Sequence, residues 1–105
     1  MLFLGFTTVN VENLTECIQA ADKIGKNPPE GYKLLEMYSC QANPFDGTPL
    51  KKGEMVSISL VECDSSEALA AANLEMIVAG AKINRIPVMK MAAGRIEEKV
   101  EDIKI

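Results

Sequence analysis

Several polar side chains on predicted strands alternate with apolar residues and are of types that support acid–base chemistry or ligand binding. They are Thr7, Glu36, Tyr38, Ser57, Ser59 and Arg85. Glu36 lies between Leu35 and Met37, and burial of a carboxylate in such a setting favours its neutral form and suits it to act as a general base. Arg85 suits an anionic ligand, or an ion pair with Glu36 of a second copy that anchors a dimer. Together these residues form a candidate ligand-binding site.

The same residues also have structural explanations. Glu36 on an edge strand would reach solvent or pair with a lysine, and its charge would oppose edge-to-edge aggregation. Tyr32 and Tyr38 are of a type that commonly packs its ring and leaves its hydroxyl in water. Residue types alone therefore assign no catalytic residue.

The absence of histidine removes many chemistries. Ser-His and Cys-His nucleophile pairs, a histidine-ligated haem and a two-His-one-carboxylate iron site are all excluded. Zinc would have to rely on scattered cysteines and carboxylates. We expect no metal and no cofactor.

Composition and charge narrow the classes of partner. The chain has 105 residues, of which 48% are hydrophobic, and its formal net charge is −4. Nucleic-acid binding needs concentrated positive charge, whereas Lys51–Lys52 is the only adjacent basic pair, so we expect no nucleic-acid partner. The apolar opening Met1–Phe6 is too short to span a membrane. Three cysteines without a Cys-x-x-Cys pair predict a reduced, cytoplasmic protein with buried thiols.

Hydrophobic periodicity predicts four strands and two helices. The strands are expected at 2–9, 32–41, 54–63 and 82–91, and the helices from Asn10 or Asn13 to Lys26 and from the Asp64–Glu67 capping box through Ala81. Pro87 cannot donate a ladder hydrogen bond, which predicts an edge strand or a bulge there. The connection from Asn43 to Gly53 is unusually long, and either a functional loop or a neutral insertion explains it. The tail at 92–105 is expected to be a short amphipathic helix or a docking arm.

This βαββαβ order predicts an α+β domain over 1–91 with the ferredoxin-like topology and the strand order 4-1-3-2. The alternation of Val56, Ile58 and Leu60 with serines suggests that these residues pack under the helices. Leu4, Phe6, Ile86 and Val88 would join them there. The opposite face would then carry Phe3, Gly5, Thr7, Leu34, Glu36, Tyr38, Ser57, Ser59, Arg85 and Met89. Because that face is too apolar for open solvent, we expect a homodimer.

Four stretches carry a family resemblance. They are MLFLGFTT, PPEGYKLLEMY, VECDSSEALAAANLE and INRIPVM. Over roughly 1–91 the chain resembles a small uncharacterised prokaryotic family, frequent in archaea, of the dimeric α/β-barrel superfamily. That resemblance implies two sheets paired face to face, in a superfamily that includes cofactor-free monooxygenases, haem-degrading enzymes, dehydratases and ligand-sensing domains. It implies no catalytic residues, and the long loop departs from the shorter hairpin of the pattern.

Three hypotheses about function follow. The first is a homodimeric barrel that binds a small molecule without turnover. The second is a cofactor-independent enzyme, of the monooxygenase or isomerase kind, that uses Glu36 or Tyr38 inside the barrel. The third is an accessory module that binds another macromolecule through the loop at 43–53. An enzyme needs a polar group aimed into an enclosed cavity, whereas a structural dimer would fill that space with apolar side chains.

Overall fold

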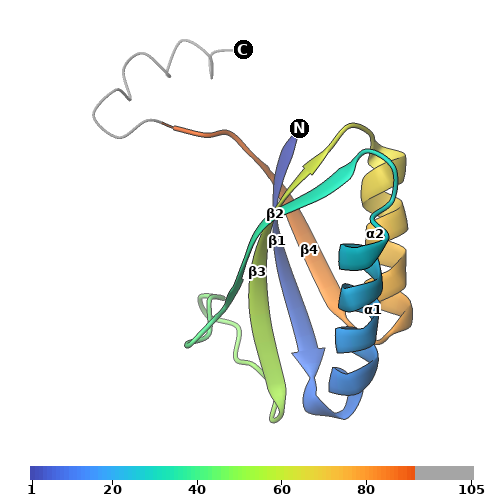
Figure 1. Ribbon diagram of the computed structural model, residues 1–105. Helices are drawn as coiled ribbons and strands as arrows, with labels where there is room; N and C mark the ends of the chain where they lie inside the picture. Colours follow the sequence, from blue (N-terminus) through green and yellow to red (C-terminus); the bar gives the residue numbers. More distant parts are fainter. Residues whose placement is uncertain (92–105) are drawn as a thin grey trace.

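Four antiparallel strands and two helices make up residues 1–91, the part of the chain that this computed structural model describes (Figure 1). In chain order the elements are β1 (Leu2–Asn10), a 3-10 turn (Val11–Asn13), α1 (Leu14–Lys26), β2 (Tyr32–Ser39), β3 (Glu54–Cys63), α2 (Ser66–Val78) and β4 (Lys82–Val88). The tail predicted at 92–105 lies outside the described residues. The element order agrees with the sequence prediction.

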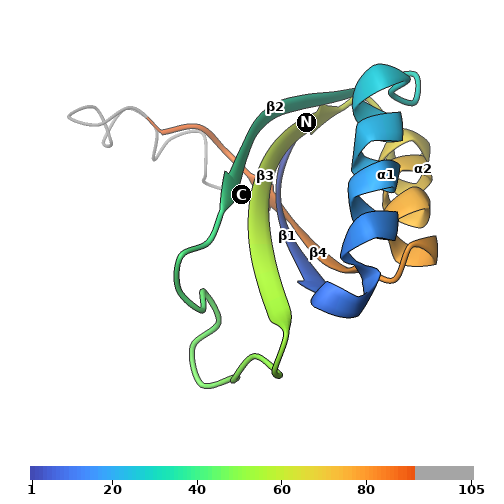
Figure 2. The same cartoon turned by 60° about the horizontal axis from the view of Figure 1, so that its bottom comes forward.

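The strands form one sheet in the order β2-β3-β1-β4, with every neighbouring pair antiparallel. This is the predicted ferredoxin-like topology, and the α+β fold class is confirmed. β4 is an edge strand, as Pro87 indicated. Both helices cover the same side of a strongly curved sheet (Figure 2). We call this the helix side, and we call the opposite surface the open face.

The helix ends follow from local sequence. At the start of α1, the side chain of Asn10 accepts a hydrogen bond from the amide of Glu12 at 3.0 Å, whereas Asn13 forms no such cap. At the start of α2, the Ser65 hydroxyl accepts from the amide of Ala68 at 3.2 Å, so the cap lies one residue after Asp64, the first residue of the predicted capping box. α2 ends at Val78, earlier than predicted, because Gly80 follows with a φ of +104° and closes the helix.

The core lies between the helices and the sheet. Its larger cluster consists of Ile24, Tyr32, Val61, Cys63, Ala68 and Ala72, with Phe3, Leu69 and Met76 packed against it. A smaller cluster of Val9, Cys17 and Ala81 lies at the other end. Alanines 68 and 72 supply α2's buried surface, so the helix can approach the sheet closely.

The two faces of β1, β3 and β4 are the reverse of the prediction, whereas Glu36 and Tyr38 of β2 lie away from the helices as predicted. Phe3 and Val61 pair across β1 and β3 and belong to the helix-side core, so residues of the same alternation on those strands point to the helices. The predicted helix-side residues instead lie on the open face: Leu4, Phe6, Ile58, Leu60, Ile86 and Val88. The prediction failed because it placed the most hydrophobic row of β3 side chains under the helices. The structure puts the row with small side chains there, where an alanine-rich helix fits.

Gly80 and Gly25 provide a matched test of the helix ends. A Cβ at Gly80 would lie 2.8 Å from Cγ of Asn13, in a left-handed backbone conformation, whereas a Cβ at Gly25 in α1 would meet nothing within 4 Å. We expect Gly80→Ala to lower the free energy of unfolding by about 1–3 kcal/mol. Gly25→Ala should raise it by up to about 1 kcal/mol because alanine favours helix. Urea unfolding measures both, and equal midpoints for the two variants would contradict this account of the turn.

Candidate functional site

Arg85 lies on the helix side, beneath α2. Its Nε donates to Oδ1 of Asn73 on that helix at 3.0 Å, and its Nη1 lies 3.4 Å from the hydroxyl oxygen of Ser59. The close approach depends on Gly5, because a Cβ there would lie 2.7 Å from Nη1 of Arg85. The guanidinium therefore ties the sheet to α2 and does not point toward the open face.

Thr7, Ser57 and Ser59 share the side of Arg85. Ser59 pairs with Gly5, which in turn pairs with Arg85, and Thr7 and Ser57 pair two residues further along β1 and β3. Residues two apart in a strand face the same way. Thr7 and Ser59 are each 8% exposed. These hydroxyls lie under the helices, not inside a space enclosed by two sheets.

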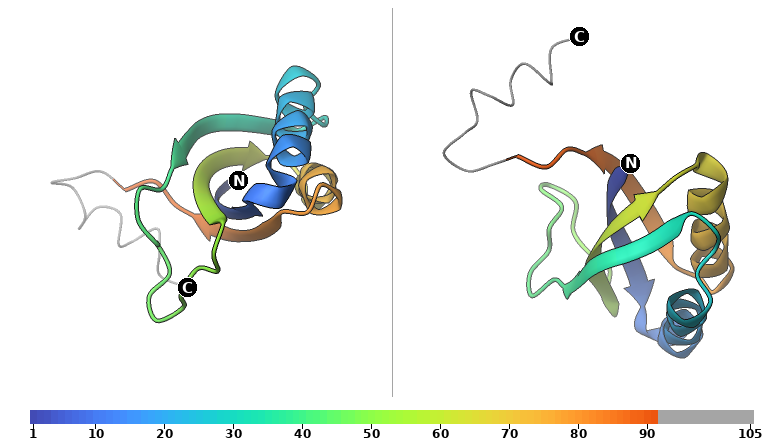
Figure 3. Two further views of the ribbon diagram at one scale, coloured as in Figure 1. Left: turned by 90° about the horizontal axis from the view of Figure 1, so that it is seen from below. Right: turned by 45° about the horizontal axis from the view of Figure 1, so that its top comes forward.

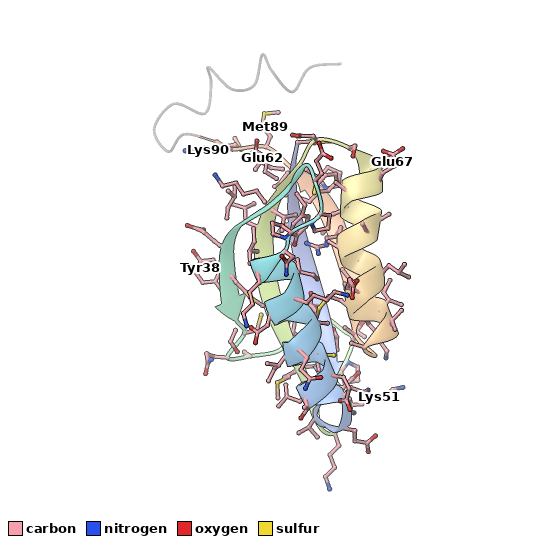
Figure 4. All side chains as sticks on the ribbon, turned by 45° about the vertical axis from the view of Figure 1, so that its right-hand side comes forward. Tyr38, Lys51, Glu62, Glu67, Met89 and Lys90 are labelled. Carbon is pink, nitrogen blue, oxygen red and sulfur yellow. The ribbon has the colours of Figure 1, made fainter. Side chains whose placement is uncertain are left out.

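Glu36 and Tyr38 lie on the other side, at the edge strand β2. They pair with Leu60 and Ile58 of the open face, and the Tyr38 hydroxyl donates to a Glu36 carboxylate oxygen at 2.8 Å. Tyr38 points outward from β2, away from the helices (Figure 4). A register shift between Leu34 and Glu36 places Leu35 as the extra residue of a bulge. Both polar side chains are exposed, which matches the edge-strand explanation of Glu36.

The structure therefore divides the candidate residues into two groups. Glu36 and Tyr38 form one, and Thr7, Ser57, Ser59 and Arg85 form the other on the opposite side of the sheet. An ion pair between Arg85 and Glu36 of a second copy across the open face is not compatible with this placement. The division leaves a carboxylate and a phenol as the polar groups of the predicted ligand set that lie on the open face.

A shallow hollow lies beside Glu36 on the open face. It has a volume of about 500 Å³ and is lined by Leu2, Leu35, Glu36, Leu60, Val88, Met89 and Lys90. Its floor is apolar, and a carboxylate and an ammonium group stand in its lining. This combination suits a small molecule with an apolar body and a polar end.

The long loop at 40–53 lies on the side of the sheet away from the helices (Figure 3). The ring of Phe45 packs against that of Phe6 on the open face, with 5.7 Å between the centroids. The side chain of Asn43 accepts from the amide of Phe45 at 2.9 Å and donates to the carbonyl of Thr48 at 2.8 Å. The loop thus covers one end of the open face, and the end near Glu36 stays uncovered.

The structure shows the state of the cysteines and whether the described residues could bind a metal ion or cross a membrane. Cys17 and Cys63 are buried and unpaired, as predicted, whereas Cys40 is unpaired but only half-buried. Burial raises the pKa of both thiols, and the charge of Glu16 raises that of Cys17 further. Both stay protonated at neutral pH. Residues 1–91 hold no group of three or more His, Cys, Asp or Glu side chains placed for a metal ion. Neither described helix combines the length and apolar character needed to cross a membrane.

Comparisons with known proteins support the fold assignment and do not indicate a function. No family model matches the chain, and no curated protein matches it. Among solved structures, the uncharacterized protein TM1266 from Thermotoga maritima is similar, with 11% identity, a TM-score of 0.53, and coverage of 84% of this chain and 96% of that one. A de novo designed protein, Foldit4, is similar with 10% identity, a TM-score of 0.51, and coverage of 86% and 97%. At these identities the likeness supports the small ferredoxin-like fold alone.

Sequence reasoning missed most of the hollow. The prediction assigned Leu60 and Val88 to the helix side and assigned Leu2, Leu35 and Lys90 to neither face. One signal in β3 could have corrected the assignment. Glu62 continues the row of Ile58 and Leu60, whereas Val61 and Cys63 continue the row of the serines and are buried. A charge at the end of one row and apolar residues at the end of the other indicate which row faces the core.

The Glu36–Tyr38 hydrogen bond has a measurable consequence. Donation to the Glu36 carboxylate raises the pKa of Tyr38 above its ordinary value, and the negative charge of Glu36 adds to the effect. The resulting stabilisation is present at neutral pH and is lost as pH rises through the raised pKa. We expect Glu36→Gln to shift the tyrosinate absorbance curve at 295 nm to lower pH. Superimposable titration curves for the wild type and the variant would contradict the hydrogen bond.

Proposed function

We propose that the protein is a homodimer that joins two copies through the open face and binds a small amphipathic molecule at the rim of that interface without turnover. The observation that carries this proposal is the open face itself. It presents Leu4, Phe6, Ile58, Leu60, Ile86 and Val88 on the side that neither helix covers. Ile86 is 43% exposed, and the other five side chains are half-buried. An apolar sheet face left in water is costly, and a second copy is the simplest cover.

A two-fold axis would place the same patch of each copy on the other. Such an interface is closed, and it also shields the unpaired strand edges. Each Leu- or Ile-sized side chain gains about 1.5–3 kcal/mol on full burial. A row of them on three strands can therefore offset the association cost of about 4–15 kcal/mol. The face-to-face arrangement is that of the dimeric α/β barrel.

The hollow beside Glu36 supports the ligand-binding part of the proposal. Its floor is contributed by open-face residues, so a partner sheet would cover part of it and enclose a bound molecule. Tyr38 uses one carboxylate oxygen of Glu36, which leaves acceptor capacity for a ligand donor. The ligand class is a small molecule with an apolar body and an amine or another hydrogen-bond donor.

Binding without turnover fits the hollow better than catalysis. Arg85, Thr7, Ser57 and Ser59 lie on the helix side, so Glu36 lacks them as catalytic partners. The Tyr38 hydroxyl already donates to Glu36, and this hydrogen bond raises the pKa of the phenol above its ordinary value. A cofactor-independent enzyme that uses Glu36 as a base remains the alternative.

A second apolar surface lies on α2, separate from the loop at 43–53 through which the accessory-module hypothesis expects a partner. The outer side of α2 exposes Leu74, Ile77 and Val78, by 61%, 54% and 78%. A helix that is apolar on both sides often contacts a further partner. A test of the open face should therefore include this surface as its rival.

We expect the wild type to sediment at twice the chain mass of 11.4 kDa at micromolar concentration. Ile86→Arg should give a folded monomer because it places a charge in the interface, with the affinity between the two copies lowered by at least about 100-fold. Ile77→Arg makes the same exchange on α2 and should leave the dimer intact. Sedimentation equilibrium with circular dichroism distinguishes the two surfaces. A monomeric wild type, or a dimer split by Ile77→Arg alone, would contradict the proposal.

Glu36→Gln tests the ligand site. Loss of a charge-assisted hydrogen bond should weaken binding of an amine about 10- to 100-fold and remove its thermal stabilisation. The probes are a panel of small aliphatic and aromatic amines, measured by thermal shift. Glu30→Gln makes the same charge change in the exposed turn before β2 and serves as the control. Amines that stabilise the wild type and Glu36→Gln equally would remove the hollow from the proposal.

A further inference from the structure

A second cavity lies on the helix side of the sheet, between α1 and the strands β1, β2 and β3. It has a volume of about 160 Å³ and is partly open to solvent. Ile18, which is 52% exposed, and Met37, which is 55% exposed, belong to its lining and lie at its mouth. The sheet separates this cavity from the open face, so it is independent of the proposed interface and of the hollow beside Glu36.

The floor of this cavity is a row of three hydroxyl side chains. Ser39 of β2 pairs with Ser57 of β3, and Ser57 pairs with Thr7 of β1, so the three residues lie side by side across three strands. All three line the cavity. The row explains why the space exists, because larger side chains at these positions would fill the gap beneath α1.

The walls are apolar. α1 contributes Leu14, Cys17, Ile18 and Ala21, and methionines 37, 55 and 76 close the sides. Methionine side chains adapt to the shape of a ligand and make favourable contacts with aromatic rings. Cys17 adds no charge, since its raised pKa keeps the thiol protonated while Sγ donates to the carbonyl of Ala79 at 3.5 Å.

These features define the chemistry of an occupant. Every lining residue is uncharged, and burial of an unpaired charge there would be costly. Each hydroxyl can donate one hydrogen bond and accept others. A cavity of about 150 Å³ with apolar walls holds a molecule of the size of benzene. We propose that this cavity binds a neutral, mainly apolar small molecule with one hydroxyl or carbonyl group directed at the row of Thr7, Ser39 and Ser57.

Phenol is the probe, with benzene and benzoate as matched compounds of one ring. Phenol is added stepwise to the full chain, and the amide chemical shifts are measured by NMR. The amides of Thr7, Cys17 and Ser57 should show saturable shifts. Benzene should bind more weakly than phenol because it cannot use the hydroxyls, and benzoate should not bind because it is charged. Benzoate binding as tight as that of phenol, or phenol shifts confined to Leu60 and Ile86, would overturn the proposal.

Two variants locate the binding. Ala21→Leu should fill the cavity from α1 and abolish the shifts with phenol. Ser57→Ala should weaken phenol binding about 3- to 10-fold while leaving benzene binding unchanged, because it removes the hydroxyl and adds no volume to the floor of the cavity. Equal loss of phenol and benzene binding in Ser57→Ala would overturn the role of the hydroxyl row. Phenol binding should persist in Ile86→Arg, so failure here is distinguishable from failure of the dimer proposal.

Discussion

Two helices cover one side of a four-stranded sheet, and the other side carries a continuous row of Leu, Ile, Phe and Val side chains. This arrangement is forced by topology, because both βαβ connections have the same hand and place their helices together. The part of the open face that the loop at 40–53 leaves uncovered must then stay in water or be covered by another molecule. The proposed dimer and the ligand hollow at its rim both depend on this constraint, since the floor of the hollow is part of the same surface.

On the helix side, small and polar residues of the sheet leave room for the Arg85 side chain and for a cavity beneath α1. Gly5 and Ser59 make room for the Arg85 side chain, which reaches Asn73 of α2. Ser57 and Thr7 leave the space beneath α1 that forms the second cavity. The polar residues on this side of the sheet thus contact α2 and line the second cavity, whereas Leu60, Ile86 and Val88 lie on the open face, where we propose that a second copy covers them. Two candidate binding surfaces result, one on each side of a single sheet.

The fold was predictable from sequence because it depends on local signals and on topology. The start of α2 within the Asp64–Glu67 segment, the edge position indicated by Pro87 and the strand order agree with the prediction, although Ser65 and not Asp64 caps the helix. The choice of face was not predictable from the alternation of Val56, Ile58 and Leu60 with serines, because both rows of β3 bury residues: Val56 in one and Val61 in the other. The candidate site divided for the same reason. The bulge at Leu35 also sets which β2 side chains reach the open face, and no residue near Leu35 in the sequence predicts a bulge there.

Intermolecular contacts between methyl groups test the central claim most directly. In a sample that mixes isotope-labelled and unlabelled chains, a filtered NOE experiment detects only protons of different copies that lie within a few ångströms. The account predicts intermolecular contacts from Leu60, Ile86 and Val88, and none from α2. Contacts from Leu74 and Ile77 instead, or no intermolecular contact at all, would contradict the assignment of the open face as the surface where two copies meet.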